Sequence, residues 1–248
     1  MEKPRHRCGI LAAAVAAAVS MFVVLGTVTP SRAALTTESC LVQKSKAWSK
    51  LRQCERSEDA KAILGRPADR AKCKTRFTTT VARIKATASA AGIACRYRDN
   101  LDNTVTDFDT GLMWVKLVAL NGNQSADILD ADNLYSWPRA LEVTGMLNGM
   151  SSNSEFLDSV PGNGKYTDWR LPNVTELVAI VDVAPSGCGS GAPCIDPTFR
   201  PTDALSYWSS TTRSTVQHFA FLVDFGIPSV DDRSKGDVAH IRPVRAGL

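Results

Sequence analysis

The chain of 248 residues contains side chains that could perform nucleophilic or acid–base chemistry. His218 and His240 lie among many serines and aspartates, which together are the inventory of a Ser-His-Asp triad. The Gly-x-Ser-x-Gly turn that exposes a nucleophilic serine is absent from the sequence. Residues 99–248 offer 19 acidic side chains for glycosidase chemistry, but no spacing distinguishes one carboxylate pair. We therefore expect no catalytic residue and no organic cofactor.

Two acidic runs could supply the six to eight oxygen ligands that calcium prefers. The runs consist of Asp99, Asp102, Asp107 and Asp109, and of Asp127, Asp130, Asp132 and Asn133. Neither has the Gly and Glu positions of an EF-hand, and Glu-Pro-Asn, a typical lectin motif, is absent. Asp127, Asp130 and Asp132 stay as weak calcium candidates. The alternative is that these residues only form turns.

Residues 1–33 have the pattern of a secretory signal peptide. A basic start is followed by an apolar run over 10–28, then by Pro30 and by Ser31 and Ala33 at the −3 and −1 positions of a cleavage site. We expect cleavage near Ala33 and a secreted, periplasmic or cell-surface protein. The alternative is an uncleaved membrane anchor, because an apolar run of about 19 residues is long for a signal.

Charge divides the rest of the chain into two parts. Residues 34–98 carry 15 Lys+Arg and 5 Asp+Glu, whereas residues 99–248 carry 10 and 19, so the net charges are +10 and −9. The basic part could contact an anionic envelope polymer such as lipopolysaccharide, teichoic acid or a sulfated glycan. Alternatively, it could simply present solvated helix faces next to an acidic domain. Nucleic acid is not an expected partner of an exported chain with few aromatic residues in its basic part.

Four cysteines of the basic part predict a cross-linked helical hairpin. Apolar residues recur at helical spacing over 40–61 and over 73–91, and Gly65 and Pro67 separate the two segments. Antiparallel helices would bring Cys54 near Cys73 at the turn and Cys40 near Cys95 at the open end. Among the three possible connectivities, this nested one suits a hairpin. The sequence lacks Cys-x-x-Cys pairs, so we expect disulfides rather than structural zinc.

Residues 99–248 predict a mixture of short strands and helices. The expected strands are 105–108, 112–117, 166–171, 206–212 and 219–225. The expected helices begin at Ser136, whose side chain can cap the first of them, and at Asn173. Asn173 and Glu176 have the spacing of a capping box, and Val174, Leu177, Val178 and Val181 would form the buried face of that helix. The fold class is therefore α+β, with domains at 34–98 and 99–248.

Six ordered blocks in residues 99–248 resemble the Lcl C-terminal domain family. They are Val105-Thr-Asp…Thr110-Gly-Leu-Met-Trp114, Asp168-Trp-Arg-Leu-Pro-Asn173…Glu176-Leu177, Ile195-Asp-Pro, Tyr207-Trp-Ser-Ser210, Val223-Asp-Phe225 and Ile241-Arg-Pro-Val-Arg245. The family takes its name from a collagen-like bacterial adhesin and is similar to C-type-lectin-like and formylglycine-generating-enzyme-like folds. The resemblance does not cover the hairpin.

The resemblance implies a C-type-lectin-like domain, with two helices on a small and mostly antiparallel sheet. Trp114, Trp169 and Trp208 would then be core or loop-anchoring residues, and the alternative is that one of them is exposed and stacks on a sugar. Formylglycine-generating relatives use cysteine chemistry. Here Cys188 and Cys194 enclose a five-residue loop and are expected to form a disulfide, which argues against that activity.

In relatives of this family, the segment before the final Val-Arg often forms the displayed and variable surface. The corresponding residues here are Thr212, Arg213, Gln217, His218, Asp231, Asp232, Arg233 and Lys235. Their mixture of donors and acceptors suits a glycan or protein ligand, although a plain solvated loop is equally compatible. We expect an adhesin-like, non-catalytic recognition module of the bacterial surface. An envelope enzyme and a structural or assembly module are the alternatives.

Overall fold

The computed structural model describes residues 35–118, 128–149 and 161–248, and within these ranges two long helices precede nine short strands and two further α-helices. The order is that of an α+β protein, as predicted. The expected signal peptide and the calcium candidate Asp127 lie outside the described residues. No helix in the described ranges combines the length and apolar character that a membrane span requires.

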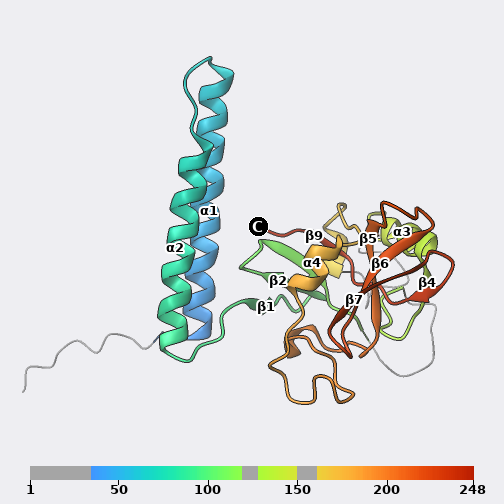
Figure 1. The fold of residues 1–248 in the computed structure, drawn as a ribbon. Coiled ribbons are helices and arrows are strands. Elements are labelled where there is room, and N and C mark those ends of the chain that lie inside the picture. Colours follow the sequence, from blue (N-terminus) through green and yellow to red (C-terminus); the bar gives the residue numbers. More distant parts are fainter. Residues whose placement is uncertain (1–34, 119–127, 150–160) are drawn as a thin grey trace, which may run out of the picture. The chain divides into compact units, whose positions relative to one another are not determined.

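The two long helices, α1 (Thr37–Ile63) and α2 (Arg70–Ala90), form a hairpin (Figure 1). Each begins at a side-chain cap: Thr36 accepts a hydrogen bond from the amide of Ser39, and Asp69 accepts one from the amide of Lys72. Such caps satisfy backbone donors that the first helical turn leaves unpaired. Gly65 has φ +67°, a left-handed conformation that glycine adopts without steric cost, and it follows the end of α1.

Two disulfides tie the hairpin at its turn and at its open end. They join Cys54 to Cys73 and Cys40 to Cys95, so the predicted nested pairing is confirmed. Between the helices lie mostly small or aliphatic buried side chains, namely Leu41, Ala47, Leu51, Val81, Ile84 and Ala88. This core is thin, and covalent cross-links are the usual compensation for a core of limited size.

A four-stranded antiparallel sheet follows the hairpin. Its strands are ordered β1 (Tyr97–Asp99), β2 (Thr104–Asp107), β3 (Leu112–Val115) and β9 (Val244–Ala246). The last strand lies against β3, with Met113 opposite Arg245. The final block of the family pattern is thereby paired with the first, which closes the domain.

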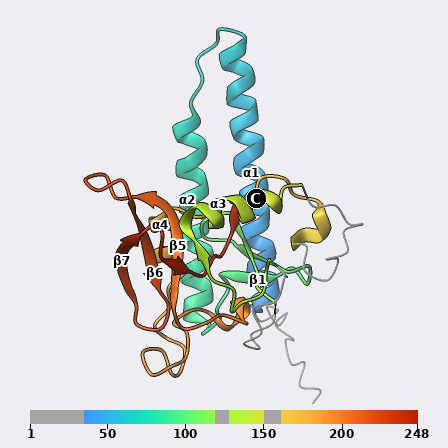
Figure 2. The same cartoon turned by 90° about the vertical axis from the view of Figure 1, so that its right-hand side faces the viewer.

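A second sheet is a three-stranded antiparallel meander of β5 (Ser206–Thr212), β6 (Phe219–Asp224) and β7 (Ser229–Ser234). The three strands run side by side in both views (Figures 1 and 2). The register between β5 and β6 shifts between Trp208 and Thr212, which marks a bulge near the end of β5. The strands β4 (Tyr135–Ser136) and β8 (Val238–Ala239) form a separate short pair.

The helices of the domain are α3 (Trp137–Met146) and α4 (Val174–Ala179), and 3-10 turns occur at Pro161–Gly164 and Pro197–Phe199. The predicted capping box between Asn173 and Glu176 is present at the start of α4. Two finer predictions are wrong. Ser136 precedes α3 without a side-chain capping bond, and Val178 is 42% exposed because the six-residue α4 buries only a narrow stripe around Leu177.

The predicted strand over 166–171 is also wrong. Only Arg170 forms a ladder contact, an isolated bridge to Val244, and the neighbouring residues lack regular pairing. Each amide on a regular strand needs a partner, and here Asn148 supplies one from outside the sheet: its Oδ1 accepts from the amide of Trp169 at 2.6 Å. Trp169 and Leu171 are buried, so the apolar residues of this segment indicate burial and not pairing in a strand.

The three tryptophans predicted to lie in the core do so. Trp114 and Trp208 are fully buried and Trp169 is 3% exposed. Arg242 is also fully buried, and its guanidinium donates to the carbonyl of Val115 at 3.0 Å and to Oγ1 of Thr202 at 2.7 Å. Burial lowers the pKa of Arg242 below its ordinary value. These bonds connect β3 to the segment that follows the second 3-10 turn, so Arg242 has a structural role.

Contacts at the base of the hairpin join it to the β2–β3 turn, and residues 35–248 form one compact unit. The Nζ of Lys44 donates to the carbonyl of Cys95 and to Asp109, both at 2.6 Å, and the indole of Trp48 donates to the carbonyl of Phe108 at 3.0 Å. Gly111 has φ +74°, and a Cβ there would lie 2.6 Å from the Trp48 ring. Glycine is therefore required on both conformational and steric grounds.

Candidate functional site

Most of the ligand-binding residues predicted from the sequence lie at one end of the β5–β7 sheet, where β5 connects to β6 and β7 ends. Residues 213–218 connect β5 to β6, and the amide of Arg213 donates to the carbonyl of Phe219 at 3.0 Å, which closes this connection tightly. On the other side of β6, the amide of Lys235 donates to the carbonyl of His218 at 2.8 Å. The backbone therefore fixes the positions from which these side chains project.

Strand register sets which side chains become neighbours. Thr212 lies opposite Ala220, which lies opposite Arg233, so the three residues share one row across the sheet. Directly paired residues of antiparallel strands point to the same face. Arg213 forms an ion pair with Asp232 at 2.7 Å, and the Nζ of Lys235 donates to Oγ1 of Thr212 at 3.0 Å.

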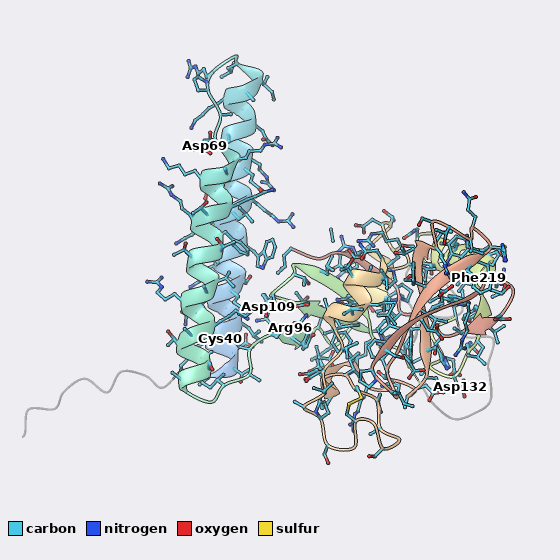
Figure 3. The ribbon with its side chains drawn as sticks, viewed as in Figure 1. Cys40, Asp69, Arg96, Asp109, Asp132 and Phe219 are labelled. Carbon is cyan, nitrogen blue, oxygen red and sulfur yellow. A yellow bond between two sulfur atoms is a disulfide. The ribbon has the colours of Figure 1, made fainter. Side chains whose placement is uncertain are left out.

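Two aromatic side chains join this polar group. The ammonium of Lys235 lies 4.0 Å from the centroid of the Trp137 ring, a cation–π contact. The Trp137 indole donates to the carbonyl of Ser209 at 2.8 Å, which anchors the ring to β5. Phe219, labelled in Figure 3, has its ring 4.9 Å from that of His218. Both aromatic side chains are partly exposed.

We call this group the sheet-end site. It comprises two clusters at the same end of the sheet. Thr212, Arg233, Lys235 and Trp137 lie on the face that packs against α3. Asp232, paired with Arg213, and Phe219, with His218 beside it, lie on the opposite face. Gln217 and Asp231 flank it as exposed residues of the β5–β6 connection and of β7. The carboxylate of Asp231 accepts from the amide of Asp232, so it shapes its own strand.

Trp137 and Phe219 are site residues that were not predicted from the sequence. Trp137 lies at the first position of α3 and meets Lys235 across 98 positions of sequence. No local signal predicts such a contact, because it depends on how α3 packs against β5. Phe219 belongs to an alternating apolar strand pattern, and that pattern does not reveal which residue lies at this end of the sheet.

The calcium candidates are only partly described. Asp130 is 4% exposed, and its Oδ1 accepts from the amide of Asp132 at 3.4 Å, a turn-forming contact. Across the described residues, no three or more His, Cys, Asp or Glu side chains come together in a group that could hold a metal ion. In the first acidic run, Asp99 pairs with Lys116 and Asp107 pairs with Arg96.

The histidines do not assemble into a recognisable triad among the described residues. His240 is 2% exposed, and its Nε2 lies 3.4 Å from Oδ2 of Asp203. Burial lowers the pKa of His240 below its ordinary value, against the opposing attraction of Asp203. A neutral ring packed against Tyr207, with ring centroids 5.1 Å apart, is typical of a core histidine.

The loop before Ile195 is closed by a disulfide between Cys188 and Cys194. Cys194 is fully buried, and its amide donates to the carbonyl of Phe225 at 2.6 Å. Bonded cysteines have no free thiol to act as a nucleophile. These two cysteines stabilise a loop at the end of β6.

These observations define the class of protein: a disulfide-bonded α+β domain with antiparallel sheets, one of which carries polar and aromatic side chains at its end. The sequence model of the Lcl C-terminal domain matches residues 103–245, which run from the start of β2 into β9. This match covers more than half of the chain, so the protein belongs to the Lcl C-terminal domain family. The hairpin lies outside the matched residues. No curated protein matches the sequence.

Proposed function

We propose that the protein is an exported, non-catalytic recognition module that binds a glycan or protein ligand through the sheet-end site. The observation that supports this proposal is that six of the eight predicted residues and two aromatic side chains lie on the two faces of one exposed sheet end. Rigid sheets that display polar loops are a common basis for binding surfaces.

The chemistry of the site fits ligands rich in hydroxyls or carbonyls. A guanidinium has five N–H donors and an ammonium has three, so the pairings of Arg213 and Lys235 leave donors available to a ligand. Partly exposed Trp137 and Phe219 offer ring faces and edges for apolar parts of a sugar or peptide. Because neighbours already hold the two cations, binding would cost little side-chain entropy.

The family, the disulfides and the start of the chain support the same proposal. Membership in the Lcl C-terminal domain family and the order of helices and antiparallel strands favour a C-type-lectin-like fold. Three disulfides suit an oxidising compartment, and the basic and apolar start of the chain suits export. Surface display of an adhesin-like module is consistent with both features.

The test is a glycan array combined with a protein pull-down, using oxidised protein. The variant Gln217→Ala/Arg233→Glu changes an exposed side chain of the site and an exposed one that flanks it, and Lys165→Glu makes the same charge reversal on an exposed residue outside the site. We expect the site variant to lose most of the signal and the control to keep it. An empty array and pull-down would contradict the proposal, as would turnover of a substrate by the protein.

A further inference from the structure

One side of the hairpin carries a groove that the sheet-end site does not use. Its volume is about 550 Å³, within the range of ligand-sized sites. The floor includes Ala47 and Leu51 from α1 and Phe77 from α2. The rim carries Lys50, Arg76 and Arg83. The groove therefore combines an apolar floor with a cationic rim.

Within the described residues, the rim cations Lys50, Arg76 and Arg83 form no ion pair. Six other cations of the hairpin part each have one, namely Lys44, Lys61, Lys85, Arg70, Arg96 and Arg98. The hairpin as a whole has a net charge of +10. An anionic occupant would therefore gain favourable interactions that the hairpin does not satisfy internally.

The groove also has a periodicity that restricts the shape of an occupant. On α1 it is lined at positions 47, 50, 51 and 54, and on α2 at positions 73, 75, 76, 77, 79, 80 and 83. Lining positions three and four residues apart follow one face of α1 and a broader side of α2. The stripe on α2 is roughly 15 Å long, or about three helical turns. A surface of this kind accepts a third helix, as in helical bundles.

Charge excludes two occupants from within the same chain. A second copy of the hairpin would bring another net charge of +10 to the rim. The N-terminal segment begins with Lys3, Arg5 and Arg7, so it would place further positive charge there. Like charges placed side by side oppose association.

A flat anionic membrane is a poorer match than a helix. Lys50, Arg76 and Arg83 line the groove, but Arg52, Arg56 and Lys74 lie outside it and are exposed. The cations therefore surround the hairpin, whereas an interfacial membrane helix concentrates them on one face. The apolar floor between two helices also matches the apolar stripe of an amphipathic helix.

We infer that this groove is a docking site for an acidic amphipathic helix of a partner protein, whose apolar face covers Leu51 and Phe77 and whose carboxylates pair with Lys50, Arg76 and Arg83. This site is separate from the sheet-end site. The protein would then have two binding surfaces, one on the family domain and one on the hairpin that precedes it.

The test titrates the oxidised full chain with a synthetic peptide of about 18 residues, stapled into a helix with leucines on one face and glutamates on the others. The groove variant is Lys50→Glu/Arg76→Glu/Arg83→Glu. The matched control, Arg52→Glu/Arg56→Glu/Lys74→Glu, makes the same change in net charge outside the groove. A third variant, Thr80→Trp, fills the groove without changing charge. Circular dichroism establishes that each variant is folded.

We expect the groove variant to weaken peptide binding about thirtyfold or more and Thr80→Trp to weaken it about tenfold, with an effect of threefold or less in the control. Equal losses in the groove variant and the control would overturn the proposal, because they would indicate non-specific charge attraction. Binding to phosphatidylglycerol vesicles without binding to the peptide would also overturn it, in favour of a lipid surface.

Discussion

The Nζ of Lys44 in α1 lies 2.6 Å from Oδ1 of Asp109 in the turn between β2 and β3. The Lys44 side chain is 1% exposed, whereas that of Asp109 is 16% exposed and also pairs with Lys85. The disulfide between Cys40 and Cys95 lies in the same apolar cluster as Phe108, which precedes Asp109. The ion pair therefore ties the hairpin to the family domain, and the disulfide closes the hairpin beside Phe108 of that domain. Cys40 and Asp109 are labelled in Figure 3.

Lys44 is more deeply buried than its partner Asp109, and this difference in burial leads to a stability prediction. Asp109→Asn should destabilise the protein by about 3 kcal/mol, because it leaves the buried ammonium of Lys44 without a counter-charge. Lys44→Met should cost about 1–2 kcal/mol, since Asp109 keeps Lys85 and partial contact with water. Urea unfolding followed by circular dichroism measures both. Equal effects of the two variants would contradict this prediction.

Acid should destabilise the fold through His240. Burial lowers the pKa of His240 in the folded protein, so the unfolded chain binds a proton that the folded chain does not. The free energy of unfolding is therefore predicted to fall as the pH falls below about 6.5, the ordinary pKa of histidine. Urea titrations between about pH 7.5 and 5 measure this slope. His240→Gln should flatten it, and an unchanged slope in that variant would refute the assignment.

Removing the disulfide near the hairpin turn should affect the hairpin locally. The double variant Cys54→Ser/Cys73→Ser opens a cross-link with a sequence separation of 19 residues, and we expect it to destabilise the hairpin by about 3 kcal/mol. Amide hydrogen exchange should accelerate over residues 50–76 and stay unchanged in β5–β7. Faster exchange in both regions would mean that the hairpin and the domain unfold together.

Sequence reasoning predicted the parts of the fold that local patterns encode. The seven-residue spacing of Cys40, Ala47 and Cys54 identified α1, and the hairpin geometry then fixed both of its disulfides. The spacing of Asn173 and Glu176 located the start of α4, because a capping box is a contact between near neighbours. The predicted bounds of β5, 206–212, agree with the structure.

The features that sequence reasoning missed depend on contacts between distant parts of the chain. Residues 166–171 have the composition of a strand, yet they lack a pairing edge, and Asn148 satisfies the Trp169 amide instead. Trp137 belongs to the sheet-end site only because α3 packs beside β5, which places the ring under Lys235. Periodicity within one segment carries no information about such neighbours.

The central claim is that the sheet-end site binds the ligand. Hydrogen exchange of the full chain, measured with and without the glycan or protein that the array or pull-down identifies, tests this claim most directly. We predict slower exchange over residues 212–219 and 231–235 on binding, with no chemical change in the ligand. Slower exchange confined to other parts of the domain, or conversion of the ligand to a product, would contradict the account.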